Sequence, residues 1–421
     1  MYQLSEEVRK NLFDRGVVDL TERFSAQGFV LKGSFVHRGP FGWQTVAVVG
    51  LDDCEQGFVA GGGMKLKPFK DPFSDETLTD LMLANVEAAG TMAEKFSVAG
   101  PFFESGAPIC GTKFLGAVPN TLPGTIEETI RDIVRTFGPL LMNCLGTGGD
   151  ENAPFSLVRK VMMSLGYAHP QQGIIAGLGL PVRETCELLD RVCQHPVEVP
   201  LIGEVRLIDT AAGFTTFVAL KTAAGGEING LRLAVQGTGA LGLLLIGFLS
   251  EEEPIIVGVS SINGMVANDR GLDVAEIMAA VDRKPPRGWK ESLEGFRWFD
   301  VPLGVAENLT ALISGRNLDA ILPCATAHAV TGQNVESVLS ALSGGKKLLI
   351  SGADDGVTSE AVGKLVENGV VVPPDFVVNA GVAAVFGMVE DGRVNDPDQD
   401  VLAMLRENTE EFIRKPPKWR I

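Results

Sequence analysis

The chain of 421 residues is 45% hydrophobic and 21% charged, proportions typical of a folded globular protein rather than a disordered one. This length exceeds what one ordinary core supports, so we expect two domains with a crevice between them for a small-molecule substrate. The formal net charge of -17 at pH 7 argues against nucleic-acid binding, because an acidic surface repels a phosphate backbone.

The N-terminal residues 1–16, MYQLSEEVRKNLFDRG, are charged from the start and lack the apolar core of a signal peptide. The longest apolar run, Leu241–Leu249, is too short to cross a bilayer. The six cysteines form no CxxC pair and the four histidines lie far apart in sequence, which favours neither a metal site nor a disulfide framework. These features predict a cytoplasmic protein without a metal or a membrane segment.

The first half of the chain has mixed α/β character. Residues Gln44–Leu51 form a short β-branched run that predicts a strand, and Ser74–Ser97 predicts a helix with Ser74 as its N-cap. Residues Gly124–Gly138 predict a second helix. Between Gly148 and Val205 the pattern is less regular, with Gly and Pro punctuation and no clear repeat.

The stretch Pro139–Ala153, PLLMNCLGTGGDENA, has two interpretations. Its glycines could hold a phosphate, or its Asp or Glu could move a proton during catalysis. The phosphate interpretation fails because no Lys-Ser/Thr pair opens a helix after GTGG.

From Leu231 onward short apolar strands alternate with helical stretches. Such alternation predicts a parallel sheet with helices on both faces, so the second half is expected to be a doubly wound Rossmann domain. The expected strands are Leu231–Gln236, Pro254–Ser261, Leu318–Cys324, Lys346–Ala353 and Gly369–Asn379.

A GxGxxG pattern follows the first of these strands and opens a helix. Gly237 would make the tight turn, Gly239 would allow close backbone approach to a pyrophosphate, and Gly242 would allow close contact between helix and strand. Ala240 opens the helix, whose N-terminus favours an anion. This pattern predicts dinucleotide binding, and a tight turn without a ligand is the alternative.

The end of the next strand bears on the choice of cofactor. An Asp or Glu at this point would hold the ribose of NAD, but the chain has Ser260 and Ser261. Small hydroxyl groups tolerate a 2′-phosphate, so both NAD and NADP remain open.

Several segments together resemble the glutamate/leucine/phenylalanine/valine dehydrogenase family. LDAILPCATAHAVTGQNV resembles the family's D-x-L-x-P-C-A block, SGADDGVTSEA its E-G-A-N-G-P-T-T-P-E-A block and PPDFVVNAGV its P-D-x-x-x-N-A-G-G block, while GVSSINGMVANDRGLD resembles its strand and loop at the cofactor. The resemblance covers Arg206–Glu390 well and Gly57–Asp150 more faintly.

The resemblance implies a domain arrangement. Residues 1–204 would form an α/β substrate and assembly domain, and residues 205–380 the dinucleotide-binding Rossmann domain. The C-terminal helical segment, about 381–421, would pack back on the first domain. Because the family usually assembles through its first domain, a homo-oligomer is expected.

The implied reaction is the reversible oxidative deamination of an amino acid to a keto acid and ammonia. MAEKFS resembles the family's M-T-x-K-x-A helix and places Lys95 at the substrate-carboxylate clamp. SGAPICGTKFLGAV resembles its glycine-rich loop and places Lys113 at the catalytic lysine. The alternative is that both are solvated surface lysines.

The family's catalytic aspartate has no identical counterpart. If CLGT matches the family's D-x-x-T, Cys144 occupies that position, and a thiol is a poor substitute because it has a higher pKa and hydrogen-bonds weakly. Asp150 or Glu151, a few residues later, could relay the proton instead.

Further departures concern the substrate. Gly61 replaces the lysine that pairs with the side-chain carboxylate in glutamate enzymes, so glutamate would lack a partner. Val382 replaces the second glycine after NAG, and the serine that closes on the substrate would fall at Val385 or Phe386. The pocket is therefore expected to favour an apolar or specialised, non-glutamate amino acid.

Three more residues are placed on the nicotinamide side by the resemblance. They are Thr210 in VRLIDTAAGF, Ala325 after PC and Asn379 after the last strand. Thr and Asn near strand ends are also ordinary caps, which is the alternative for them.

Three functions follow from these observations. The first is an NAD(P)-dependent amino acid dehydrogenase. The second is a biosynthetic imine or keto reductase of the same fold, and the third is a non-catalytic dinucleotide-binding protein that has lost the proton relay.

Overall fold

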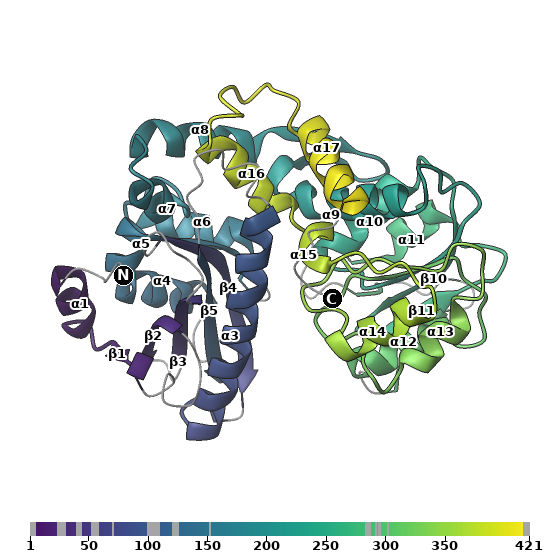
Figure 1. Ribbon diagram of the computed structural model, residues 1–421, viewed down its shortest axis with the longest axis horizontal. Helices are drawn as coiled ribbons and strands as arrows, with labels where there is room; N and C mark the ends of the chain where they lie inside the picture. The colour runs from purple at the N-terminus through teal and green to yellow at the C-terminus, as the bar shows by residue number, and fades with distance from the viewer. Residues whose placement is uncertain are drawn as a thin grey trace. The chain divides into compact units, whose positions relative to one another are not determined.

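The computed structural model describes residues 6–22, 31–38, 44–51, 59–69, 71–98, 110–119, 126–150, 153–282, 288–290, 293, 296–300 and 303–415. The chain forms two compact units, shown in Figure 1. The first comprises Met1–Val192 and Phe386–Pro397, and the second comprises Cys193–Val385 and Asp398–Ile421. The C-terminal segment is thus shared between the units, whereas the resemblance assigned all of it to the first domain.

The first unit contains a mixed sheet. In the described residues its strand order is β1-β2-β3-β5-β4-β6, with antiparallel pairing from β1 to β5 and parallel pairing of β4 with both β5 and β6. The strands are β1 (Val18–Asp19), β2 (Leu31–Arg38), β3 (Gln44–Leu51), β4 (Ala60–Phe69), β5 (Cys110–Pro119) and β6 (Leu145–Gly149). The strand predicted at Gln44–Leu51 is confirmed.

Helices cover both faces of this sheet. Helix α3 (Asp75–Val98) packs against β3 and β5, and the backbone N–H of Thr77 donates to Ser74 Oγ at 3.0 Å, which confirms Ser74 as its cap. The other face carries a hydrophobic cluster shared with the remaining helices, including Met64, Phe114 and Phe137. These helices are α1 (Glu6–Phe13), α4 (Ile126–Thr136), α5 (Gly138–Asn143) and α6 (Phe155–Ser164).

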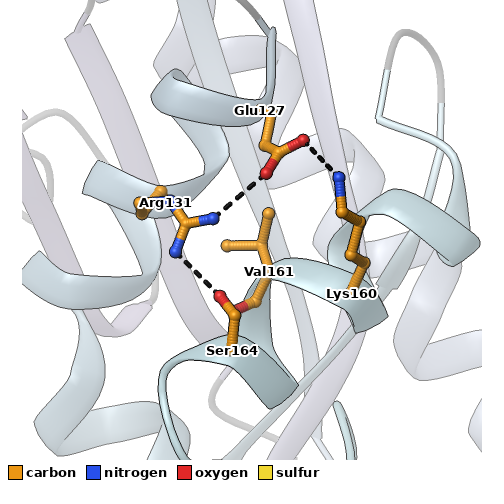
Figure 2. Close-up of polar contacts among 5 residues, drawn as sticks. All are labelled: Glu127, Arg131, Lys160, Val161 and Ser164. Atoms are coloured by element: carbon orange, nitrogen blue, oxygen red, sulfur yellow. Dashed lines mark hydrogen bonds and ion pairs between the residues drawn. The ribbon is translucent and has the colours of Figure 1, made fainter.

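Polar contacts hold α4 beside α6, as Figure 2 shows. The carboxylate of Glu127 accepts from Arg131 at 3.1 Å and from Lys160 at 2.7 Å, and Arg131 also donates to Ser164 Oγ at 2.7 Å. Ser164 donates in turn to the carbonyl oxygen of Val161. Exposed ion pairs contribute at most about 1 kcal/mol each, so the contacts orient α6 while the apolar cluster supplies most of the stability.

The second unit contains the sheet expected for the Rossmann domain. In the described residues its strand order is β12-β11-β10-β9-β13-β14, and β10, β9, β13 and β14 run parallel. Strands β11 and β12 extend it as an antiparallel edge. The strands are β9 (Arg232–Gln236), β10 (Ile255–Ser261), β11 (Gly264–Ala267), β12 (Phe296–Trp298), β13 (Ala320–Pro323) and β14 (Leu348–Leu349). A separate hairpin joins β7 (Pro196–Val199) to β8 (Gly203–Arg206).

Consecutive residues of the central strand β9 are fully buried, which requires cover on both faces of the sheet. One face packs against α12 (Val305–Ile313), α13 (Val335–Ala341) and α14 (Ser359–Glu367). Helices α9 (Leu207–Ala223), α10 (Ala240–Leu249) and α17 (Val401–Arg414) pack together, as Figure 1 shows. The guanidinium of Arg406 on α17 lies 5.7 Å from the ring of Phe214 on α9, which keeps α17 with this unit. Helix α11 (Val274–Ala280) also belongs to this unit.

One predicted strand is absent from the described part of the structure, and one segment for which no element was predicted is largely helical. In Gly369–Asn379 only a bridge between Leu348 and Val371 forms, and the strand gives way to the short helix α15 (Asp375–Val378). Pro373 and Pro374 lack the N–H groups a strand ladder needs, and proline is favoured where a helix begins. Much of Gly148–Val205 is helical, in α6, α7 (Gln172–Gly177) and α8 (Val182–Gln194).

Candidate functional site

The second unit has a topological switch point at β9. Strand β10 pairs with one side of β9 and β13 with the other, so the chain reverses its order across the sheet there. Ligands of such sheets bind outside the carboxyl ends of the strands at the reversal. Gly237 directly follows β9 with φ +105°, and a Cβ there would lie 2.9 Å from the backbone nitrogen of Ala325. Gly237 and Ala325 therefore lie side by side at the switch point.

The glycine-rich turn has the geometry expected for holding a phosphate. The N–H of Gly237 donates to the carbonyl oxygen of Ser260 at 2.8 Å, which fixes the turn against β10. A Cβ at Gly242 would overlap the carbonyl oxygen of Gly237, whereas a Cβ at Gly239 would meet nothing within 4 Å. Gly239 is the N-cap of α10 and Ala240 its first residue. The open side of Gly239 at a helix N-terminus suits a pyrophosphate.

The two serines that end β10 donate to different hydrogen-bond partners. Ser260 is fully buried and donates to Asn308 Oδ1 at 2.7 Å, while Asn308 donates to the carbonyl oxygen of Ser261 at 2.9 Å. Ser261 donates to Asn263 Oδ1 at 2.6 Å. The Ser260 hydroxyl is thus occupied inside the fold, and the Ser261–Asn263 pair is the polar group at the strand end. Asn308 lies far along the chain, so no sequence spacing points to it.

Asn379 lies beside the same edge of the sheet. Its Nδ2 group donates to the carbonyl oxygen of Gly352 at 3.1 Å and to Asp354 Oδ1 at 2.6 Å. Thr210 on α9 is buried, and its hydroxyl donates to the carbonyl oxygen of Arg206 at 3.0 Å. A Cβ at Gly381 would overlap the backbone of Ala211, so α9 packs directly against the segment after Asn379. Asp354 was not among the site residues predicted from the sequence.

In the first unit Asp150 lies directly after the carboxyl end of β6. Its backbone N–H and carbonyl both pair with Ala153, at 3.0 and 2.9 Å, in a tight turn. A Cβ at Gly63 would lie 3.1 Å from Asp150 Oδ2, so the carboxylate lies against the glycine segment of β4. A carboxylate held at the carboxyl end of parallel strands is suitably placed to exchange a proton with a ligand.

The strand register brings Lys113 close to this carboxylate. Gly63 pairs with Gly148, and Met64 pairs with Phe114, the residue after Lys113. Adjacent strands lie about 4.8 Å apart, so the backbone of Lys113 is roughly 10 Å from β6. The side chain of Lys113 and all of residue Glu151 lie outside the described part of the chain.

Lys95 lies near the end of α3 and is only 8% exposed. A lysine is rarely this buried unless its ammonium group has a partner, which argues against a solvated surface role. The next residue, Phe96, packs over Gly61 on β4, so this end of α3 lies over the strand against which the carboxylate of Asp150 lies.

Cys144 and Asp150 lie at opposite ends of β6. Cys144 precedes the strand, belongs to the apolar cluster and is 7% exposed, and burial raises the pKa of its thiol to about 12. The five residues of β6 separate it from Asp150, a distance of roughly 20 Å along the strand. Of the three residues considered for the proton relay, Cys144 and Asp150 are therefore not brought together, and Glu151 lies outside the described residues.

The positions that were expected on the substrate side have apolar surroundings. A Cβ at Gly61 would lie 2.7 Å from Phe96 Cζ and 2.8 Å from Ile174 Cδ1, so these side chains fill the space in which a longer residue would stand. On α16 (Gly381–Glu390), Val382 is half-buried and Val385 fully buried, both within the second unit.

In the first unit, Phe386 packs near two other rings. The ring centroids of Phe155 and His169 each lie 6.1 Å from that of Phe386. His169 is fully buried, and its Nδ1 accepts from the N–H of Gln171 at 3.1 Å, so the proton of the neutral ring resides on Nε2. Burial lowers the pKa of His169 to about 3. The histidine is thus a neutral member of an aromatic cluster, a role that sequence alone did not indicate.

A cavity of about 500 Å³ occupies a different part of the first unit. It lies beside α1, α4 and α5, which pack on the face of the sheet opposite to α3, and it is not part of the candidate site. In the described residues no group of three or more His, Cys, Asp or Glu side chains could hold a metal ion. None of the helices described there is long and apolar enough to cross a membrane.

Residues 204–415, half of the chain, match the glutamate/leucine/phenylalanine/valine dehydrogenase family. The chain belongs to this family. This membership confirms the resemblance inferred from the sequence motifs.

Curated relatives match over a limited segment. The NADP-specific glutamate dehydrogenase of Saccharolobus shibatae is 32% identical over 194 residues, which cover 44% of this chain and 40% of the relative. The NAD-specific glutamate dehydrogenase A of Halobacterium salinarum is 27% identical over 199 residues, or 45% and 41% of the two chains. The match therefore spans about two fifths of these relatives' length.

Solved structures share the fold over most of the chain. Hetero-hexameric glutamate dehydrogenase from Thermus thermophilus, in its Leu-bound form, aligns with a TM-score of 0.59 at 20% identity and covers 88% of this chain and 77% of that one. Plasmodium falciparum glutamate dehydrogenase aligns with a TM-score of 0.57 at 15% identity, covering 88% and 71%. The expected fold, an α/β domain joined to a Rossmann domain, is confirmed.

Proposed function

We propose that the protein is an NAD(P)-dependent amino acid dehydrogenase that acts on a non-glutamate, apolar or specialised amino acid. The observation that carries this proposal is the position of Asp150 at the carboxyl end of β6, against Gly63 and two strands from the backbone of Lys113. A family member that had lost catalysis would have no need of a carboxylate at this point.

The roles of the residues follow from their chemistry. Lys113 activates the water or ammonia and stabilises the developing carbonyl oxygen, and Asp150 relays protons between this group and solvent. Lys95 holds the α-carboxylate of the substrate. The nicotinamide ring, when bound, accepts or returns a hydride. Cys144 takes no part, because it lies in the core at the other end of β6.

The cofactor is proposed to bind along the carboxyl edge of the second unit. The turn at Gly237 and Gly239 holds the pyrophosphate, and Ala325, Thr210 and Asn379 border the nicotinamide. Ser261 and Asn263 face the adenine ribose, with Ser260 supporting them from inside. Because no carboxylate stands at Ser260–Gly264, both NAD and NADP are accommodated.

The substrate preference follows from the packing at Gly61. The side chains of Phe96 and Ile174 leave no space there for the lysine that would neutralise a glutamate side chain. An unpaired carboxylate in a closed apolar site carries a large desolvation cost. Val382, Val385 and Phe386 add further apolar surface on α16, so an aliphatic or aromatic side chain is preferred.

The remaining properties are proposed by analogy. The protein is a homo-oligomer that works in the cytoplasm on a small-molecule substrate, without nucleic acid or membrane as a partner. The related Thermus thermophilus enzyme is described as hetero-hexameric, which supports assembly. Analytical ultracentrifugation of the purified chain tests the oligomeric state.

The decisive experiment follows the absorbance of reduced nicotinamide. The protein is mixed with NAD or NADP and a panel of amino acids at alkaline pH, and then with the corresponding keto acids and ammonium. A signal confined to apolar or aromatic members supports the proposal. Turnover of keto acids without ammonium, or of cyclic imines, would instead establish the reductase alternative. Cofactor binding without any turnover would establish the non-catalytic one.

Variants assign the chemistry to the site. Lys113→Ala is expected to abolish turnover and leave binding of reduced cofactor intact. Lys364→Ala is the matched control, because Lys364 lies on α14 and pairs with Glu336 on the surface. If Lys113→Ala kept the turnover of the control, the chemistry would have to be assigned to other residues.

A further inference from the structure

The amide of Asn379 has a fixed orientation. Its Nδ2 group donates to the carbonyl oxygen of Gly352 at 3.1 Å and to Asp354 Oδ1 at 2.6 Å. A carbonyl oxygen and an ionised carboxylate can only accept, so the nitrogen must face these two partners. Both amide hydrogens are then used. The buried Oδ1 of Asn379 has no hydrogen-bond partner within the described protein.

This amide lies close to the switch point of the sheet. The N–H of Gly352 donates to the carbonyl oxygen of Pro323 at 2.9 Å, and Pro323 ends β13. A Cβ at Gly352 would lie 3.2 Å from the sulfur of Cys324, the residue before Ala325. Asn379 is therefore held at the carboxyl edge where Gly237 and Ala325 meet.

The loop that carries Asp354 is itself anchored on both sides. The N–H of Gly356 donates to the carboxylate of Asp375 at 3.3 Å, at the start of α15. The carbonyl oxygens of Asp355 and Gly356 accept from the backbone N–H groups of His328 and Val330, at 2.8 and 3.0 Å. Because these hydrogen bonds hold the loop in place, the carboxylate of Asp354 can orient the amide of Asn379.

The residue type at position 354 is a departure from the family pattern. The block E-G-A-N-G-P-T-T-P-E-A, which Ser351–Ala361 resembles, has asparagine where this chain has Asp354. An asparagine could donate to or accept from Asn379, so two amide orientations would be compatible with it. The carboxylate permits only the orientation observed here.

We propose that Asp354 is a positioning residue that orients the Asn379 amide so that Oδ1 accepts a hydrogen bond from the carboxamide N–H of the bound nicotinamide. This inference rests on the proposed function in one respect, the binding of a nicotinamide dinucleotide at the switch point. A buried acceptor without a partner is unfavourable, and a ligand N–H relieves that cost. Asp354 thereby links the fold of the Ser351–Gly356 loop to recognition of the carboxamide.

The test compares two cofactors by isothermal titration calorimetry. The 3-acetylpyridine dinucleotide has a methyl ketone in place of the carboxamide, so it keeps the carbonyl and lacks the N–H donor. We expect wild-type protein to bind the natural dinucleotide roughly 3- to 10-fold more tightly, the typical net effect of one hydrogen bond. In Asp354→Ala only the carbonyl oxygen of Gly352 still favours this orientation, so the two dissociation constants should come to within about twofold of each other.

Two further variants separate orientation from charge and folding. Asp354→Asn can accept from Asn379 or donate to it, so its discrimination should lie between those of wild type and Asp354→Ala. Asp355→Asn removes one negative charge from the same loop, leaves the carboxylate at 354 in place and should discriminate as wild type does. Thermal unfolding followed by circular dichroism verifies that each variant is folded.

The outcomes are distinguishable. Equal discrimination in wild type and Asp354→Ala, or none in wild type, would overturn the positioning role. Loss of discrimination in Asp355→Asn as well would attribute the effect to charge and overturn it too. Discrimination that depends on Asp354, in a protein that turns over no amino acid, would support the positioning role while the proposed reaction failed.

Discussion

Replacing Cys144 by aspartate would place a carboxyl group in the core of the first unit. The thiol is 7% exposed among apolar side chains, and burial raises its pKa from 9.0 to about 12. Three pKa units correspond to about 4 kcal/mol between the ionised and neutral forms. An aspartate with the same desolvation would titrate near pH 7 rather than near its ordinary value of about 4.

The cost of this substitution depends on pH in a defined direction. A carboxyl group whose pKa rises on folding is neutral in both states below about pH 4, so the ionisation cost is then absent. As the pH rises from about 4 to about 7, the unfolded state loses its proton while the folded state keeps it. We therefore expect Cys144→Asp to lose up to about 4 kcal/mol of unfolding free energy by pH 7 and to recover most of it near pH 4.

Urea unfolding followed by circular dichroism at pH 4.5 and pH 7.5 measures this difference, with Cys144→Ser as the neutral polar control of similar size. The amino acid turnover of each variant is measured in parallel. Wild-type stability of Cys144→Asp at pH 7.5, together with raised turnover, would refute the reasoning. It would mean that position 144 opens on the reacting groups and is the family's aspartate position after all.

Four other expectations test the remaining geometry. Asp150→Asn should lower kcat by roughly 10²- to 10⁴-fold with little change in the dissociation constant of reduced cofactor, measured by fluorescence; an unchanged kcat would exclude the relay. In Gly149→Ala the added Cβ would overlap the backbone at the start of α6, so the free energy of unfolding measured in urea should fall by about 1–3 kcal/mol or more. Gly363→Ala is the control: its Cβ would stand in open space on α14, and the free energy of unfolding should rise by about 0.5–1 kcal/mol. Burial lowers the pKa of His169 to about 3, so the neutral ring stabilises the fold fully above pH 6.5. The free energy of unfolding should fall by about 5 kcal/mol as the pH drops from 6.5 to 3, because the unfolded state binds the proton first. His169→Phe should remove this part of the pH dependence of stability. Burial, and to a lesser extent the charge of Asp391, raises the pKa of Glu390 to about 8, so the free energy of unfolding decreases as the pH rises from 4.5 to 8. Glu390→Gln should therefore be more stable than wild type at pH 8 by up to about 5 kcal/mol. Equal stability of the two proteins at pH 8 would show that Glu390 is solvated.

Local sequence signals predicted an element correctly where the interacting groups lie within a few residues of one another. Ser74 caps α3 as predicted, because the hydroxyl and the N–H it accepts from are three residues apart. The GxGxxG turn likewise lies between β9 and α10, since a tight strand-to-helix turn depends on the glycines themselves. The alternation of strands and helices also gave the correct class for the second unit.

One strand prediction was wrong, and one helical segment could not be predicted, because local signals compete in both. The apolar residues of Gly369–Asn379 resemble a strand, yet two prolines end the pairing and α15 begins directly after them. The segment from Gly148 to Val205 contains α6, α7 and α8, whose apolar periodicity is interrupted by Gly and Pro between short helices. Short helices of this kind are stabilised by tertiary packing more than by their own sequence.

The two α/β halves, the family and the glycine-rich turn could be predicted from the sequence, because these depend on residues that are neighbours along the chain. The three-dimensional structure was needed to show that Asp150, and not Cys144, lies at the carboxyl end of β6, because this strand runs from the apolar cluster to the glycine segment of β4. It also decided that Ser260 bonds inward to Asn308 and that Asp354 holds Asn379. Such pairs lie tens of residues apart, and packing of the sheet and its connecting segments brings them within hydrogen-bonding distance.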